Sequence, residues 1–294
     1  KSPMMLKSRY GYAMDPIFEG LLEATALTVE KVLASVKQAD VIVQKALGIG
    51  TGPFTTHNLA GGNPITQHGL TESHTKIMPW YRSPKLLDDQ VESGLPWETA
   101  AKGETAEYSP EVFEAVSNRA LGAYFGMVCE IVDSGIASIG DMELGFDLGL
   151  AMTPPFGLMN KLGVRKALEL VEACARENAG FKLPKILVKQ AASGKPWKIP
   201  VVFREDKKDV AIVRIRRPRV LNALNQEVFA QFREIFTKIK KDSKIKGAVL
   251  TGFGTRAFVS GADIGMLASQ KTPEEAEAFC LKSMAVLDLI ENLG

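Results

Sequence analysis

Residues 249–264 have the sequence VLTGFGTRAFVSGADI, and this stretch decides the fold of the last third of the chain. The apolar run over residues 247–251 predicts a buried strand, and the glycines after it predict a turn. Small residues at positions 260–262 let another group approach the backbone closely. Asp263 can begin a helix, and a backbone N–H in such a turn can point at a developing oxyanion. A plain strand–turn–helix connection has the same pattern, so the stretch alone leaves both interpretations open.

A second motif precedes this stretch. Residues 209–225 have the sequence DVAIVRIRRPRVLNALN, which predicts a strand over 210–215 followed by a loop. An amphipathic helix is expected over 226–241. Together, in this order, the motifs resemble the N-terminal half of the crotonase (enoyl-CoA hydratase/isomerase) superfamily. The resemblance covers residues 200–294 and implies the first, incomplete part of an α/β crotonase fold.

The crotonase resemblance implies a site for a coenzyme A thioester. In the family, a backbone N–H donates a hydrogen bond to the thioester oxygen, where negative charge develops when water adds to the enoyl group. The adenine and phosphates lie against the Arg-Pro loop, where guanidinium groups suit a phosphate. The candidate residues are the main chain of Ala262 as catalytic donor, and Arg219, Ala223, Ala262, Asp263 and Ile264 as the acyl-CoA-binding residues.

The family needs further groups to move protons. Its second oxyanion donor and the two glutamates that act as acid and base on water come after the position of Gly294. We therefore expect residues 200–294 to be less than half of a hydratase domain, and the chain to be a piece of a larger protein.

The first two hundred residues contain an internal repeat. Helical patterns over 17–47 recur over 120–148. Asp40 could cap the helix that follows it, and Asp141 is expected at the same position of the second copy. The segment Thr51-Gly52-Pro53-Phe54 recurs as Thr153-Pro154-Pro155-Phe156. The repeat predicts two related helical units that pack on each other and share one core.

The second copy has the sequence NRALGAYFGMVCEIVDSGIASIGDMELGFDLGLAMTPPFGLMNKLG over residues 118–163. It resembles the C-terminal domain of 3-hydroxyacyl-CoA dehydrogenases, well over 117–175 and weakly over 17–70. The resemblance implies an all-α, 6-phosphogluconate dehydrogenase C-terminal-like fold, and a homo-oligomer formed through the helical region. Asn118 matches a family asparagine near the catalytic pair, but the usual entry segment is missing, so we expect a structural role such as a helix cap.

Composition shifts divide the chain into three parts. We expect helical units over 1–110 and 111–195 and the crotonase-like part over 200–294, separated by a Gly- and Pro-containing linker. The dehydrogenase family uses NAD, yet Gly48–Gly52 follows a helix and lacks the strand–turn–helix context of a dinucleotide site. The NAD domain is therefore expected upstream of Lys1.

Charge and composition exclude several other classes. A net charge of +2 does not indicate a protein that binds nucleic acid, and no apolar run is long enough for a membrane span. The three scattered cysteines, Cys129, Cys174 and Cys280, are expected to be buried reduced thiols, which favours a cytoplasmic protein. His57, His68 and His74 show no metal-ligand spacing, so we expect no metal.

The sequence favours an enzyme acting on acyl-CoA. The parent is expected to be a β-oxidation protein in which an NAD-dependent 3-hydroxyacyl-CoA dehydrogenase precedes an enoyl-CoA hydratase. Two alternatives stay open. The first is another crotonase-family reaction, such as that of an isomerase, decarboxylase or thioester hydrolase, because all of them use the same donor loop. The second is a non-catalytic helical dimerisation module that carries a CoA-binding remnant.

Overall fold

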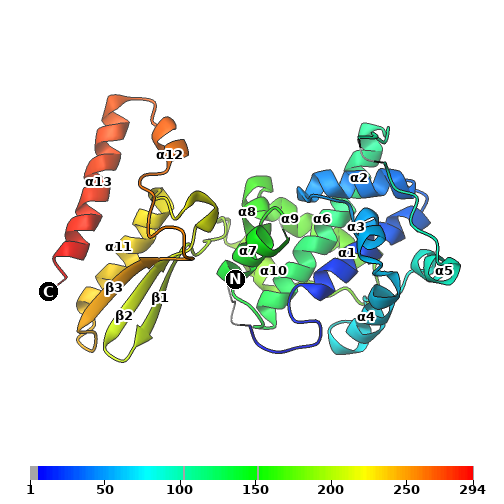
Figure 1. The fold of residues 1–294 in the computed structure, drawn as a ribbon, viewed down its shortest axis with the longest axis horizontal. Coiled ribbons are helices and arrows are strands. Elements are labelled where there is room, and N and C mark those ends of the chain that lie inside the picture. The colour runs from blue at the N-terminus through cyan, green and yellow to red at the C-terminus, as the bar shows by residue number, and fades with distance from the viewer. Residues whose placement is uncertain (1–5, 102, 151, 294) are drawn as a thin grey trace. The chain divides into compact units, whose positions relative to one another are not determined.

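The computed structural model describes residues 6–101, 103–150 and 152–293. The chain divides between Ile199 and Pro200 into two compact units, which are described separately (Figure 1). We call residues 6–199 the helical unit and residues 200–293 the C-terminal unit.

The helical unit contains five helices that recur in the same order. The first set is α1 (Asp15–Glu30), α2 (Val36–Leu47), α3 (Pro53–Ala60), α4 (Asn63–Lys76) and α5 (Lys85–Ser93). The second set is α6 (Pro110–Asp133), α7 (Ile139–Gly145), α8 (Pro155–Leu162), α9 (Val164–Glu177) and α10 (Lys185–Ala192), with a π-helical segment, Phe146–Leu150, between α7 and α8. The repeat expected from the sequence is therefore visible in the order of the helices.

Matched side-chain contacts recur in both sets. The Asn58 side chain in α3 accepts from the Trp97 backbone N–H at 2.7 Å and donates to the Trp97 carbonyl at 2.9 Å. Asn160 in α8 holds Trp197 in the same way, at 2.6 and 2.9 Å. In each set the tryptophan ring packs on the phenylalanine of the Pro-Phe motif. The amide clamp fixes the end of each set against its third helix.

Acidic side chains hold the start of α3 and of α8. Asp40 Oδ1 accepts from the Phe54 N–H at 2.7 Å, and Glu143 Oε1 accepts from the Phe156 N–H at 2.6 Å. Asp141, expected to match Asp40, lies instead in the first turn of α7. The expected match of Asp141 with Asp40 is therefore wrong. Glu143, two positions later, makes the contact that corresponds to that of Asp40, because its longer side chain reaches the start of α8. Asp40 does not cap the helix that was expected to begin at it, since it lies inside α2 and bonds to the first turn of α3 instead.

Serine side chains cap three helices of the helical unit. Ser35 caps α2 and forms a reciprocal capping box with Gln38, while Ser138 caps α7. Ser109 caps α6, so Asn118 lies in the interior of that helix. The prediction that Asn118 caps a helix is therefore wrong.

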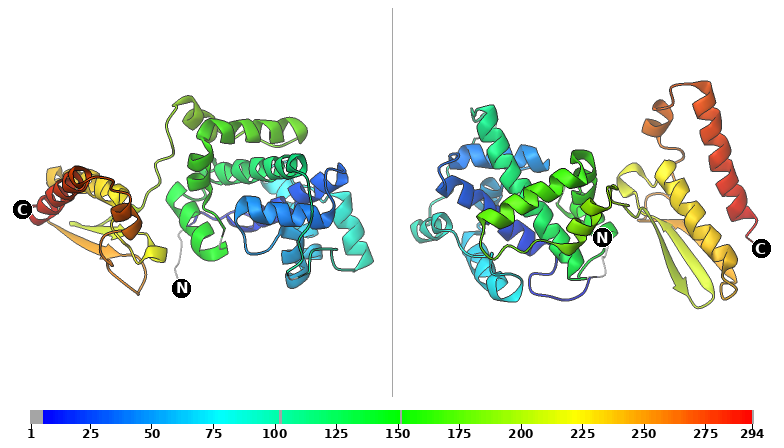
Figure 2. Two further views of the ribbon diagram at one scale, coloured as in Figure 1. Left: turned by 90° about the horizontal axis from the view of Figure 1, so that it is seen from above. Right: turned by 180° about the vertical axis from the view of Figure 1, so that it is seen from behind.

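Both sets of helices contribute to one apolar core. Helix α6 lies between α1 and α9 (Figure 2), and its buried residues include Tyr124, Phe125 and Cys129. A side chain on Gly122 would place its Cβ 2.5 Å from the Leu170 carbonyl oxygen, so glycine is what lets α6 and α9 approach closely. Because the core is shared, neither set buries its apolar face alone.

The C-terminal unit is a small sheet covered by helices. Its elements are β1 (Val202–Lys207), β2 (Val210–Ile215), α11 (Gln226–Lys241), β3 (Gly247–Gly252), α12 (Ile264–Ala268) and α13 (Pro273–Glu291). Strands β1 and β2 form an antiparallel hairpin, and β3 pairs parallel to β2 after the α11 crossover. The strand expected over 210–215 and the helix expected over 226–241 are confirmed.

Helices α11 and α13 lie on the same face of this sheet (Figure 2). Alternate residues of β2, namely Ala211, Val213 and Ile215, are buried, and Phe232 and Phe236 of α11 belong to the same core. This period of two on the strand matches one buried sheet face.

Burial of the cysteines differs from the expectation in one case. Cys129 and Cys174 are buried free thiols, but Cys280 on α13 is exposed. Within the described part of the chain, no helix combines the length and apolar character needed to cross a membrane.

The end of β3 is a point of close approach. A Cβ on Gly252 would lie closer than 3.0 Å to the carbonyl oxygens of Ala257 and Phe258 and to the Asn222 side chain. At the other end of the same strand, a Cβ on Gly247 would meet nothing within 4 Å. Only glycine at position 252 lets the following loop fold back over the strand.

We predict that Glu143→Gln flattens the pH dependence of stability. Burial, the largest cause, raises the pKa of Glu143 from 4.5 to about 7. The folded state therefore keeps a proton that the unfolded state has lost, so the free energy of unfolding falls as pH rises from 4.5 to about 7. Glutamine still accepts from Phe156 and cannot ionise.

The measurement is urea unfolding of both proteins between pH 4.5 and 8, followed by tryptophan fluorescence, since all three tryptophans lie in the helical unit. The difference in unfolding free energy should change by up to about 3 kcal/mol across the window. Glu114→Gln, on the exposed face of α6, is the control and should give a constant difference. A constant difference for Glu143→Gln would contradict the assignment.

We also predict that Gly252→Ala destabilises the C-terminal unit by about 1–3 kcal/mol, because rigid backbone atoms oppose the new methyl group. Gly247→Ala should change stability by less than about 0.5 kcal/mol. Amide hydrogen exchange of peptides from β2 and β3, measured in the whole chain, distinguishes the two variants. Equal exchange rates in both would show that the close approach is not a constraint.

Candidate functional site

Two loops of the C-terminal unit meet at a short backbone bridge. Leu224, two residues before α11, donates its N–H to the Gly261 carbonyl at 2.9 Å, and Asp263 donates its N–H to the Leu224 carbonyl at 2.8 Å. The bridge joins the loop after β2 to the loop after β3. The two motifs singled out in the sequence are therefore in contact.

The bridge also decides the direction of the Ala262 amide. In a parallel bridge the residues on either side of the central one make the hydrogen bonds, so the N–H of the central residue faces away from its partner strand. Among the described residues, the Ala262 N–H has no acceptor, and Ala262 is exposed. This geometry leaves a backbone donor directed at solvent beside a helix start.

Arg217 fixes the two loops from the side. Its Nη2 lies 2.8 Å from Asp263 Oδ2, and its Nη1 donates to the Ala223 carbonyl. Asp263 Oδ1 accepts from the Met266 N–H at 3.2 Å, so this residue caps α12 as the sequence indicates. The Arg217 guanidinium, as the largest cause, holds the pKa of Asp263 below its usual value. The negatively charged Asp263 side chain therefore helps to hold the backbone next to Ala262 in place.

Asn222 is the buried centre of the loop pair. It is 1% exposed and has a φ of +59°, a left-handed conformation that asparagine tolerates better than most residues. Its Oδ1 accepts from the Arg217 N–H at 3.0 Å, and its Nδ2 donates to the carbonyls of Phe253 at 3.0 Å and Ala257 at 2.9 Å. One side chain thus connects the loop after β2 to the turn after β3.

The sequence interpretation missed the roles of Arg217 and Asn222. An Asn between two apolar residues, shortly after a proline, is the one local signal for a left-handed turn. Nothing local shows that its amide reaches residues 253 and 257. Of the neighbouring arginines, Arg216 stacks on the Phe203 ring with its guanidinium carbon 4.1 Å from the centroid.

The remaining predicted residues surround this loop pair. Arg219 is exposed in a 3₁₀ turn over Pro218–Val220. Ala223 is buried, and its N–H already donates to the Val220 carbonyl at 3.0 Å. Ile264 begins α12 and is 82% exposed. The structure thus gathers the predicted residues in one region, where Arg219, Ala262 and Ile264 are exposed.

The Gly-rich segment near residue 50 lacks the strand–turn–helix context of a dinucleotide-binding loop. The Gly48–Gly52 segment lies between α2 and α3, and the three strands of the described chain all lie between residues 202 and 252. Nor do three or more His, Cys, Asp or Glu side chains of the described chain cluster in a way that could hold a metal ion. The His57 ring is buried and bonded to the Pro53 carbonyl and the Thr66 hydroxyl.

Comparison with known proteins finds relatives of the C-terminal unit. Residues 205–293 match the family described as enoyl-CoA hydratase/isomerase. A short-chain-enoyl-CoA hydratase of Clostridium acetobutylicum is 38% identical over 73 residues, which is 25% of this chain and 28% of that protein. A fatty acid oxidation complex subunit alpha of Shewanella frigidimarina is 36% identical over 86 residues, which is 29% of this chain and 12% of that protein.

A solved structure is also similar to part of the chain. The crystal structure of an enoyl-CoA hydratase/carnithine racemase from Magnetospirillum magneticum is 31% identical, with a TM-score of 0.31, and the match covers 32% of this chain and 36% of that one. The chain thus spans about a third or less of the length of the relatives it matches. The segment that carries both loops, residues 205–293, belongs to the enoyl-CoA hydratase/isomerase (crotonase) family.

Proposed function

We propose that the chain is part of an enzyme that hydrates enoyl-CoA thioesters, and that the Ala262 N–H donates to the thioester oxygen. The observation that carries this proposal is the exposed Ala262 amide, which has no acceptor among the described residues. Its position in a family-matched segment supports the same assignment.

The chemistry requires a donor that is fixed before the reaction. Addition of water to an α,β-enoyl thioester builds negative charge on the thioester oxygen, and a preset N–H stabilises that charge without reorganisation. Here the Leu224 bridge and the Arg217–Asp263 ion pair hold the backbone on both sides of Ala262. Loss of one such donor costs about 3–4 kcal/mol of transition-state stabilisation.

The CoA moiety is proposed to lie along the turn that carries Arg219. This side chain is exposed at the rim of the loop pair, and a guanidinium is well suited to a phosphate. Proton transfer to and from water is assigned to the glutamates that the family places in later sequence. The thioester oxygen and the phosphates would thus be bound by different parts of the same loop pair.

We further propose that the helical unit comes from duplicated 3-hydroxyacyl-CoA dehydrogenase C-terminal domains. The support is the repeated helix order, the matched Asn–Trp clamps and the relative named as a fatty acid oxidation complex subunit alpha. The nicotinamide chemistry is proposed to belong to an NAD domain outside the described residues, because the Gly48–Gly52 segment lies between two helices. A homo-oligomer through the helical region and a cytoplasmic location stay proposals.

The donor loop alone does not select hydration. Any reaction through a thioester enolate, including isomerisation, decarboxylation or thioester hydrolysis, would use the same N–H. The curated relatives named as hydratases favour hydration.

We predict that full-length protein consumes crotonyl-CoA, seen as loss of the enoyl absorbance. Ala262→Pro, which removes the N–H, should lower kcat by about 10²–10³-fold. Ala262→Ser keeps the N–H at an exposed position and should stay within a few-fold of wild type. Arg219→Ala should raise KM with little change in kcat.

The thermal unfolding midpoint of each variant shows whether it is folded. Full activity in a folded Ala262→Pro protein would exclude the donor role. A folded wild-type protein that binds crotonyl-CoA without turnover would favour the non-catalytic alternative.

A further inference from the structure

Three exposed aliphatic side chains lie around one hollow in the first set of helices. Leu59 in α3 is 76% exposed, Ile65 in α4 is 73% exposed, and Leu95, two residues after α5, is 66% exposed. Leu95 lines a hollow of about 320 Å³ together with Asn58 and Pro64, which are the chain neighbours of Leu59 and Ile65. We call Leu59, Ile65 and Leu95 the aliphatic patch.

Hydrogen bonds hold together the segments that carry the aliphatic patch. The Asn58 side chain clamps the Trp97 backbone, and Trp97 Nε1 donates to Asn63 Oδ1 at 2.8 Å. Leu95 comes two residues before Trp97, so these bonds place it beside the turn from α3 to α4. The patch is therefore part of the folded framework of the first set.

The internal repeat shows what the same backbone can carry instead. Helices α3 and α8 each have 8 residues, and α4 and α9 each have 14. Leu95 and its counterpart each lie two residues before a clamped tryptophan. The counterparts of Leu59, Ile65 and Leu95 are Lys161, Lys166 and Lys195, and all three of these lysines are exposed. The fold therefore does not require aliphatic side chains at these positions.

The sequence around the aliphatic patch carries no charge. Residues 46–71 contain no Asp, Glu, Lys or Arg. Two acids, Glu92 and Glu98, flank Leu95 in sequence, but both are exposed and can stay in solvent. Aliphatic side chains that gather on an uncharged surface are typical of a site that another molecule covers.

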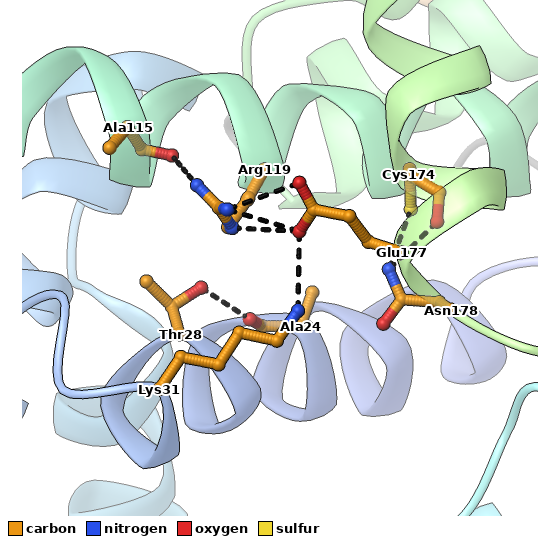
Figure 3. Close-up of polar contacts among 8 residues, drawn as sticks. All are labelled: Ala24, Thr28, Lys31, Ala115, Arg119, Cys174, Glu177 and Asn178. Atoms are coloured by element: carbon orange, nitrogen blue, oxygen red, sulfur yellow. Dashed lines mark hydrogen bonds and ion pairs between the residues drawn. The ribbon is translucent and has the colours of Figure 1, made fainter.

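The surfaces that join the two sets are already covered within one chain. Helix α1 packs on α6. Glu177 Oε2 in α9 lies 3.2 Å from Lys31 Nζ and 3.1 Å from Arg119 Nη2, and so connects both sets (Figure 3). A partner therefore has to bind an outer surface of the helical unit, and the aliphatic patch is such a surface.

We propose that the aliphatic patch is the contact between two copies of this chain, related by a two-fold axis. Both copies use the same surface in such a contact, and an uncharged aliphatic surface is complementary to itself. A strongly charged partner would find no opposite charge in residues 46–71. The proposal rests on the homo-oligomer proposed above and names its surface, but it does not depend on hydration of enoyl-CoA.

The test is sedimentation of the whole chain over a range of concentration, from about 1 to 200 µM. We expect an equilibrium between monomer and dimer. Leu59→Lys, Ile65→Lys and Leu95→Lys should each raise the Kd of the dimer by about tenfold or more, because each brings two like charges together at the contact. Each variant installs the residue that the second set has at that position, and thermal unfolding shows that it is folded.

Val188→Asp is the matched control. Val188 is an exposed aliphatic residue of α10, outside the patch, and its counterpart in α5 is Asp88. This variant should keep the Kd of the wild type. Because the patch is uncharged, raising NaCl from about 0.05 to 0.5 M should not weaken the dimer.

The possible results separate the two levels of the proposal. A wild-type chain that stays monomeric at every concentration would overturn both the patch and the homo-oligomer. A dimer that is unchanged in all three folded lysine variants, or equally weakened by Val188→Asp, would overturn the patch alone. A dimer that salt disrupts would likewise show that charged surfaces make the contact.

Discussion

Backbone hydrogen bonds on both sides of Ala262 are the constraint on which the candidate site depends. They hold the Gly261–Asp263 segment against Leu224, so the amide between them faces outward. Arg217 and Asn222 support this bridge with an ion pair and with hydrogen bonds to three backbone segments. The donor is thus positioned by contacts that a ligand does not have to form.

Contacts that recur in both sets of helices organise the helical unit. Each set of helices uses an acid to hold the start of its third helix and an asparagine to clamp a tryptophan. The two sets share one core, and an ion bridge from Glu177 joins them. The helical unit is therefore one folded body built from both sets of helices.

Much of this fold could be predicted from local sequence. The helix over 226–241 follows from its apolar period, and the start of α13 follows from Thr272 and Pro273. The small residues before Asp263 correctly indicate a loop followed by a helix start. These features depend on neighbours in the sequence, which is why pattern and capping rules suffice for them.

The errors concern contacts between distant residues. Asp141 shares a residue type with Asp40, but Glu143 shares its role, because side-chain reach and not identity decides the contact. Asn118 could not be placed without knowing that α6 begins at Pro110, with Ser109 as its cap. Likewise, the Asn222 side chain bonds to carbonyls 31 and 35 residues away, and no local pattern reports that.

The central claim is that the Ala262 amide faces a thioester oxygen. A crystal structure of the chain with an unreactive CoA thioester tests it most directly. The account predicts the thioester oxygen about 3 Å from the Ala262 nitrogen, with the Leu224 bridge unchanged. A thioester bound elsewhere, or an Ala262 N–H bonded within the protein instead, would contradict the account.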